Sequence, residues 1–288
     1  DLNGDGESDL FSTDMAPLPE EPDSLWEPVM GDIEQAQVDE IQQPRNVMQL
    51  ADGSAFDEQA AALGIAATGW SWSGLLGDLD NDGRLDVYVV NGMRATTIFE
   101  DLPDGELVEP NQAFRNSSSD EQAVSLTPAP EWGLASTAGG RGMAQADLDH
   151  DGDLDIIINN LASPAIVWEN QLCSGTSIIV EPVWSGVQNL DALGTKVVLQ
   201  VDSDPSNAVR SASITGARGY ISSSATQAHF GLGAIATDSD TQIDLQVVWP
   251  DGAVSLLDSV APGSTITVDR TAPALAVSKR AQSGGSDS

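Results

Sequence analysis

One nine-residue pattern of acidic side chains occurs three times in this sequence. Its clearest copy is Asp147-Leu-Asp-His-Asp-Gly-Asp-Leu-Asp155, and the other copies begin at Asp78 and Asp1. Alternate residues of a tight loop can direct their oxygens at one centre, and Ca²⁺ takes six to eight oxygen ligands at roughly 2.3–2.6 Å. The spacing therefore predicts up to three calcium sites.

The predicted ligands stand at positions 1, 3, 5, 7 and 9 of each loop. They are Asp1, Asn3, Asp5, Glu7 and Asp9; Asp78, Asp80, Asp82, Arg84 and Asp86; and Asp147, Asp149, Asp151, Asp153 and Asp155. Position 7 is expected to bind through its backbone carbonyl, so its side chain is free to vary. Position 9 is expected to close the site, directly or through water. Glycine at position 6 fits a sharp turn with positive φ.

Two other interpretations fit part of this pattern. An EF-hand needs a glutamate at position 12 and flanking helices. Position 12 is instead Ser12, Val89 or Ile158, and the β-branched and aromatic residues after each loop favour strands. An acidic turn without metal is the second interpretation. Three copies with one spacing disfavour it, since so many close carboxylates would repel one another.

The composition is strongly acidic. The 288 residues, enough for two domains, carry 45 acidic and 11 basic side chains, a net charge of −34. This balance argues against nucleic-acid binding, and it suits either a saline environment or a solubilising surface. Lysine occurs only at Lys196 and Lys279.

Several global features bound the setting. Cys173 is the single cysteine, which excludes an intramolecular disulfide, and we expect it to be a buried small hydrophobe. No apolar run has the length of a membrane span. Because the chain begins without Met at the first ligand of a loop, we expect it to be the later part of a longer precursor.

Residues 1–172 are predicted to be a partial first repeat followed by two full repeats of propeller-blade type. Residues 14–44 form a Pro- and acid-rich excursion, with a short helix expected near Ile33–Ile41. The sequence then predicts a strand at Arg45–Leu50 and an amphipathic turn or helix at Phe56–Leu63.

Residues 173–270 change in character, because Val, Thr and Ser fill runs of strand length between turn residues. The predicted strands are Ile178–Val183, Thr195–Val201, Ala208–Ile214, Ile243–Trp249, Val254–Leu257 and Thr265–Val268. This pattern predicts a compact antiparallel β-sandwich. Residues 271–288 are predicted to be a disordered tail or linker.

Each loop with its following strand resembles an FG-GAP/VCBS calcium-binding repeat, and the C-terminal part resembles the ASPIC/UnbV domain. The second resemblance rests on Leu193-Gly-Thr-Lys-Val197, Gly219-Tyr-Ile-Ser222, His229-Phe-Gly-Leu-Gly233 and Val247-Val-Trp-Pro-Asp-Gly252. Together, in this order, they resemble the cartilage acidic protein family and its bacterial relatives.

The resemblance implies an all-β protein with a calcium-binding β-propeller, usually of seven blades, that is secreted or surface-exposed. This chain has too few blades to close a ring. Upstream blades or a second chain should complete it. Asn3 replaces the Asp of the family pattern, so the first site should be weaker but not lost.

Other motifs are weaker. Gly231-Leu-Gly-Ala-Ile-Ala236 matches a dinucleotide pattern but lacks the strand–helix context, so we interpret it as a turn. Trp70 and Trp72 are expected to pack between blades rather than to form a sugar platform. His150 is expected to face solvent and His229 to be structural. No nucleophile–base set, HExxH motif or P-loop is present.

The leading hypothesis is a non-enzymatic extracellular, cell-surface or periplasmic module. It would bind a protein or glycan partner through the propeller face opposite the calcium loops, with residues 14–44 and 95–110. The alternatives are a structural subunit of a surface filament or layer, and a non-catalytic scaffold subunit of an enzyme or redox complex. The sequence names no partner, and it leaves the oligomeric state open.

Overall fold

The computed structural model describes residues 1–18, 44–118, 123–172, 175–201, 209–233 and 243–272, and the backbone of 276–279. The helix expected near Ile33–Ile41 and Cys173 lie outside these ranges. The described chain is all-β, as predicted, with two short 3₁₀ turns, η1 (Pro103–Gly105) and η2 (Pro130–Trp132). Its described sheets form no closed ring.

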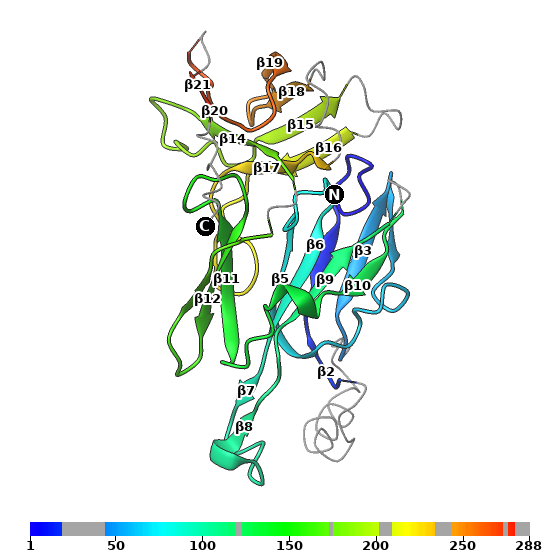
Figure 1. Cartoon of the computed structure of the whole chain (residues 1–288). Coiled ribbons are helices and arrows are strands. Elements are labelled where there is room, and N and C mark those ends of the chain that lie inside the picture. Colours follow the sequence, from blue (N-terminus) through cyan, green and yellow to red (C-terminus); the bar gives the residue numbers. More distant parts are fainter. Residues whose placement is uncertain are drawn as a thin grey trace, which may run out of the picture.

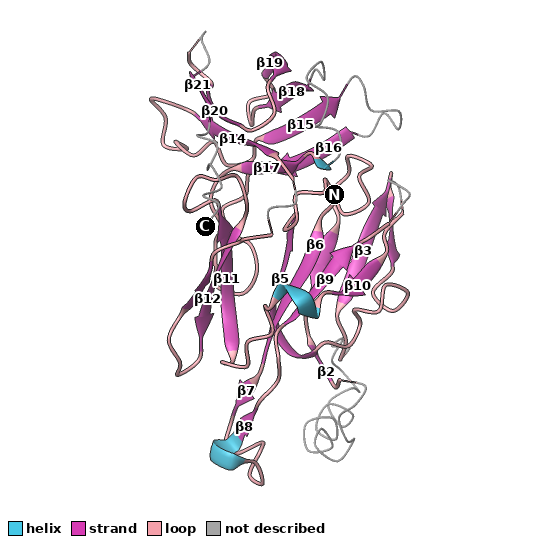
Figure 2. Ribbon diagram, in the orientation of Figure 1, coloured by secondary structure: helices cyan, strands magenta, loops and turns pink. Residues whose placement is uncertain are grey.

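Three sheets make up the first part of the chain (Figures 1 and 2). The first sheet contains β1 (Leu10–Ser12), β3 (Val47–Asp52) and β4 (Ala55–Glu58). The second contains β2 (Met15–Ala16), β5 (Gly69–Gly77), β6 (Asp86–Asn91), β9 (Gln112–Asn116) and β10 (Leu126–Pro128). The third contains β11 (Gly140–Ala146), β12 (Asp155–Asn160) and β13 (Ile166–Trp168). All three are antiparallel. A hairpin of β7 (Met93–Arg94) and β8 (Glu106–Leu107) projects from the lower end in Figure 1.

Strand β6 shows why these sheets stack. All six of its residues are buried, so both of its faces must be covered. Tyr88 and Val90 pack with Met143 and Ile158 of the third sheet, whereas Val87 and Val89 pack into a core that includes Met48 of the first. The second sheet is thus held between the other two.

The C-terminal part is a sandwich of two four-stranded sheets. The strand order of the first of these sheets is β17 (Ala228–Gly231), β14 (Ser177–Val183), β20 (Ser264–Asp269) and β21 (Ala276–Lys279). The strand order of the second is β16 (Val209–Ser213), β15 (Lys196–Val201), β18 (Ile243–Val248) and β19 (Val254–Val260). Both contribute to one core that contains Ile178, Leu199, Leu245 and Trp249. Strands β14 and β20 run parallel, so the sandwich is not wholly antiparallel as expected.

Two local predictions were wrong in part. The turn expected over Phe56–Leu63 is present only in its later half, because Ala55–Glu58 pairs with β3 as an antiparallel hairpin through the turn at Gly53. Part of the expected disordered tail, Ala276–Lys279, pairs with β20. In both places the edge of an existing sheet offers backbone hydrogen bonds that the local sequence pattern does not reveal.

The sandwich core yields the first testable prediction. Leu199 is fully buried, whereas Leu256 is 69% exposed on β19. Leu199→Ala should lower the free energy of unfolding of this domain by about 2–5 kcal/mol, because it leaves a cavity in the core. Leu256→Ala should change it by less than about 0.5 kcal/mol. Urea unfolding followed by tryptophan fluorescence measures both, and equal losses would contradict the assigned core.

Candidate metal centres

The three acidic loops lie at the same place in the three stacked sheets. Residues 78–86 connect β5 to β6, residues 147–155 connect β11 to β12, and residues 1–9 lead into β1. In Figure 1 all three lie at the upper end of these sheets, beneath the sandwich. Sheet stacking thus brings the loops side by side.

The loops share a pattern of internal hydrogen bonds. The carboxylate at position 1 accepts the N–H of position 6 at 3.2 Å in the first loop, 2.9 Å in the second and 3.1 Å in the third. The carboxylate at position 5 likewise accepts the N–H of position 7, at 2.7, 2.9 and 2.9 Å. These bonds fold each loop back on itself and turn its side-chain oxygens inward.

Position 9 does something that the sequence analysis missed. The carboxylate of Asp86 accepts the N–H of Leu79 and that of Asn116, both at 2.9 Å. Asp9 and Asp155 bridge in the same way, to Ala51 and Asn170 respectively. Each position-9 side chain therefore ties its loop to the strand that pairs with the strand after the loop, β3 or β9, or in the third loop to the segment that follows β13.

The loop backbone is left-handed at two positions. Glycine at position 6 has φ of +85°, +94° and +101° in the three loops, as predicted. Position 4 is also left-handed, at Gly4, Asn81 and His150. Glycine, asparagine and histidine tolerate that region better than other residues, so the residue types at position 4 carried a signal that was overlooked.

The second loop is the most buried centre. Oxygens of Asp78, Asp80 and Asp86 lie within 4.8 Å of one another, and these residues are at most 4% exposed. Burial raises the pKa of Asp86 to about 8, and burial together with Asp86 and Asp82 raises that of Asp78 well above its usual range. Arg115, which is not in the loop, pairs with Asp80 at 2.6 Å.

In the third loop Asp147, Asp149 and Asp151 converge within the same 4.8 Å limit, although Asp149 and Asp151 are exposed. Asp155 is not part of this group, although it accepts backbone N–H groups, those of Leu148 and Asn170, as Asp86 does in the second loop. Asp153 accepts a hydrogen bond from the side chain of Asn81 at 2.5 Å, which links the third loop to the second.

The first loop is looser. Among the described residues its carboxylates form no group of three within that limit. Glu7 turns away to accept the N–H of Gly53, and Asn3 donates to Asp5 at 2.9 Å. The side-chain oxygen of Asn3 is nevertheless buried without a hydrogen bond, and it stands at a predicted ligand position.

These donors suit a hard cation. The second and third loops each gather three carboxylates, and oxygen atoms at 2.3–2.6 Å are what Ca²⁺ requires. Buried like charges also cost free energy that a divalent cation would offset. An ion in the second loop would be held by Asp78, Asp80 and Asp86, and one in the third loop by Asp147, Asp149 and Asp151. Two other predicted ligands of the second loop, Arg84 and Asp82, instead form an ion pair with each other at 3.9 Å.

The remaining motifs do not assemble a second site. His150 is exposed, as expected, and His229 contacts the carbonyl of Gly152 at 3.0 Å. Trp70 packs on Phe99, and Trp72 packs on Tyr220. Asn116-Ser-Ser118 has the sequence of a glycosylation sequon. Asn116 is only 1% exposed and accepts the N–H of Ser125, so the folded chain does not present it.

Comparisons with known proteins support the C-terminal assignment. Residues 186–274 match the family model described as ASPIC and UnbV. Over 202 residues the chain is 30% identical to cartilage acidic protein 1 of Xenopus tropicalis. The aligned region covers 66% of this chain but only 27% of that protein. The chain thus spans about a quarter of this curated relative.

A structural comparison gives little more. A crystal structure from Bacteroides uniformis, described as a candidate cell adhesion protein, covers 73% of this chain and 90% of that one at 10% identity, with a TM-score of 0.22. That score does not establish a shared fold. Among the described residues, no helix is both long enough and apolar enough to cross a membrane.

The buried carboxyls predict how stability depends on pH. Asp78 and Asp86 hold protons in the folded metal-free protein at pH values where the unfolded chain has released them. Their contribution to folding is therefore present below about pH 4 and is lost as pH rises towards about 8. Thermal unfolding in a chelator should show a melting temperature that falls from pH 5 to pH 8.

Asp78→Asn should flatten this slope, because it removes one of the buried charges. Asp57→Asn, an exposed carboxyl outside the loops, is the matched control and should leave the slope unchanged. A metal-free melting temperature that rises between pH 5 and pH 8 would contradict the prediction.

Proposed function

We propose that this chain is part of a calcium-stabilised β-propeller of FG-GAP/VCBS type, followed by an ASPIC/UnbV domain, and that it acts as a non-enzymatic interaction module. The observation that carries the proposal is the recurrence of one nine-residue acidic loop at one place in three stacked sheets. Acidic turns without a shared role would not need identical internal hydrogen bonds.

Calcium would act through charge and geometry. In the second loop the cation would attract Asp78, Asp80 and Asp86, which otherwise repel one another. It would thereby hold together the ends of β5 and β6 that this loop connects. The arrangement serves stability rather than turnover, since the loop carboxylates are engaged with backbone N–H groups and with one another. Extracellular calcium modules bind in the range of about 10⁻⁴–10⁻³ M, which suits a secreted, surface or periplasmic location.

The partner would bind at the end away from the loops. The β7–β8 hairpin projects there, and it carries the connection over residues 95–110 (Figure 1). Val108 is 60% exposed in that segment, beside a small apolar cluster that includes Phe99 and Leu107. An exposed valine beside a hairpin that carries the exposed acidic residues Glu100, Asp101 and Asp104 fits a protein or glycan partner, and further blades or a second chain would complete the ring.

Calcium-dependent stability tests the metal part of this proposal. Excess Ca²⁺ should raise the melting temperature, because a ligand at about a hundred times its dissociation constant adds roughly 2.7 kcal/mol per independent site. Mg²⁺ should do much less. Asp78→Ala and Asp147→Ala should each remove part of the gain, while Asp57→Ala should keep all of it. Equal melting temperatures in Ca²⁺ and in chelator would refute the metal sites.

Partner binding has its own test. Protein and glycan arrays probed with the labelled chain should show binding in Ca²⁺ that is lost in chelator, because the loops set the positions of the strands that carry the hairpin. Val108→Glu should abolish the same signals and leave the calcium-dependent melting temperature unchanged. Leu256→Glu, a matched change on an exposed leucine of the sandwich, should preserve binding. Signals that survive Val108→Glu would place the partner elsewhere.

A further inference from the structure

The C-terminal sandwich lies directly on the end of the sheets that carries the acidic loops (Figure 1). Each of the three loops contacts the sandwich, and these contacts come from four different strands or their ends. They are polar and close, and several involve the same loop position. This surface was not apparent from the sequence, where the loops and the domain are separate motifs.

The first loop is held by Lys196 and Ser211. Lys196 Nζ donates to the carbonyl of Gly6 at 2.6 Å, and Ser211 Oγ donates to the same carbonyl at 3.2 Å. The backbone N–H of Ser211 donates to Asp1 Oδ2 at 3.1 Å. One of only two lysines in the chain therefore lies on this loop, and Ser211 contacts a predicted ligand directly.

The third loop is held in a similar way. Ser177 Oγ donates to the carbonyl of Gly152 at 2.5 Å, and His229 Nε2 lies 3.0 Å from the same oxygen. Gly152 is position 6 of its loop, as Gly6 is of the first. In both loops the sandwich thus fixes the peptide group between positions 6 and 7. The next carbonyl along the chain, that of position 7, is a predicted ligand.

The second loop is held by close backbone approach. The N–H of Gly233 donates to the carbonyl of Asn81 at 2.8 Å. A side chain at Gly231 would overlap Asp78 Oδ2, and one at Gly83 would meet the guanidinium of Arg210 at 2.7 Å. The two glycines of the His229–Gly233 motif are therefore needed where the domain meets this loop.

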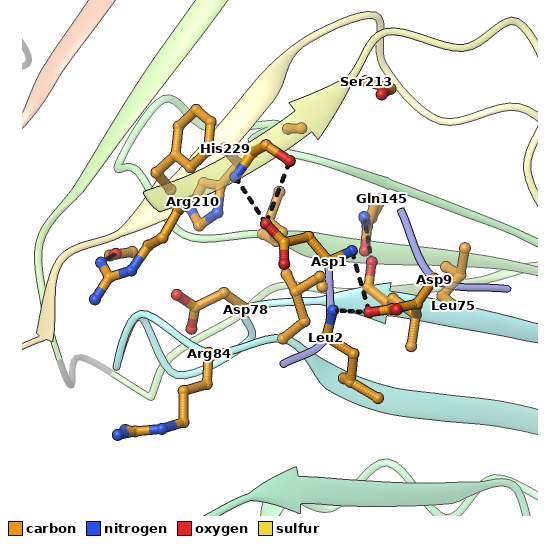
Figure 3. Close-up of a pocket in the computed structure, with 18 of the residues that line it drawn as sticks. Asp1, Leu2, Asp9, Leu75, Asp78, Arg84, Gln145, Arg210, Ser213 and His229 are labelled. Atoms are coloured by element: carbon orange, nitrogen blue, oxygen red, sulfur yellow. Dashed lines mark hydrogen bonds and ion pairs between the residues drawn. The ribbon is translucent and has the colours of Figure 1, made fainter. Parts of the chain in front are cut away.

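Figure 3 shows part of this contact region, with Asp1, Asp78, Arg210 and His229 labelled. Asp1 and Asp78 face a cavity of about 990 Å³ that is also lined by Arg210 and His229 of the sandwich. Carboxylates of two loops and cationic or hydrogen-bonding groups of the second domain thus share one space.

We propose that the sandwich completes the metal sites, with Lys196, Ser211, Ser177 and His229 as positioning residues, and that cation binding and domain docking are coupled. This inference rests on the proposed function. An isolated loop must be ordered before it can bind a cation, and that ordering costs conformational entropy. A docked sandwich has already fixed the loop, so the cation binds more tightly. By linkage, the cation must favour docking by the same factor.

Calcium titration of the whole chain by isothermal calorimetry tests the first half. Ser211→Ala should weaken the first site by roughly two- to tenfold, the usual effect of one lost hydrogen bond. Ser213 lies two residues further along the same strand, and its hydroxyl bonds to none of the described residues. Ser213→Ala should therefore bind Ca²⁺ as the wild type does. Ser177→Ala should weaken the third site instead. Both variants must first show the far-UV circular dichroism spectrum of the wild type in Ca²⁺, which establishes that they fold.

Lys196→Gln provides a second, independent variant, because its side chain reaches the first loop from β15. Lys279→Gln is its control, since β21 is the edge of its sheet opposite β17. Because the lysine also repels a cation, the titration is run at about 1 M NaCl, which screens this repulsion. Under these conditions calcium affinity should fall for the first and not for the second. Unchanged affinity in Ser211→Ala, Ser177→Ala and Lys196→Gln alike would overturn the inference.

Hydrogen exchange tests the reciprocal half. Chelation should speed exchange at the amides of Ser211 and Gly233, which donate to the first and second loops, while the amides of β18 in the sandwich core stay protected. Equal protection with and without Ca²⁺ would overturn the coupling while the metal sites themselves stood. A wild-type chain that binds no Ca²⁺ at all would overturn both this inference and the proposed function.

Discussion

Repulsion among carboxylates packed at one end of three sheets is the interaction on which this structure depends. Asp78, Asp80 and Asp86 are buried within a few ångströms of one another, and burial raises their pKa values. Such a group persists only with compensation. Part of it comes from backbone N–H groups and from Arg115, and the remainder requires protons or a cation.

The stacking of the sheets makes the problem collective. Because β6 is covered on both faces, its loop cannot move away from those of its neighbours without opening two cores. The sandwich adds a third constraint from above, through Lys196, Ser177 and Gly233. Packing therefore holds together charged segments that would separate if the sheets were free.

The sequence was informative wherever the signal was local. The glycine at position 6 and the strands of the sandwich each reflect a short-range rule, and the structure places them as expected. The acidic spacing gathers three carboxylates in the second and third loops, but not all of the predicted ligands. The strand at Ala55–Glu58 was missed because its pairing with β3 outweighs its own pattern. The roles of Asp86 and Lys196 were missed because their partners, Asn116 and Gly6, lie far along the chain. Long-range contacts of this kind leave no periodicity in a single sequence.

The side-chain bond from Asn81 to Asp153 gives neighbouring loops a shared element. A change of shape in one loop must alter the position of a group in the next, so the two would not respond to a ligand as independent sites. If both loops are tightened by the same ion, the first binding event makes the second easier. The response to rising concentration would then be steeper than that of a single site, and this end of the molecule would act as a threshold detector rather than a graded one.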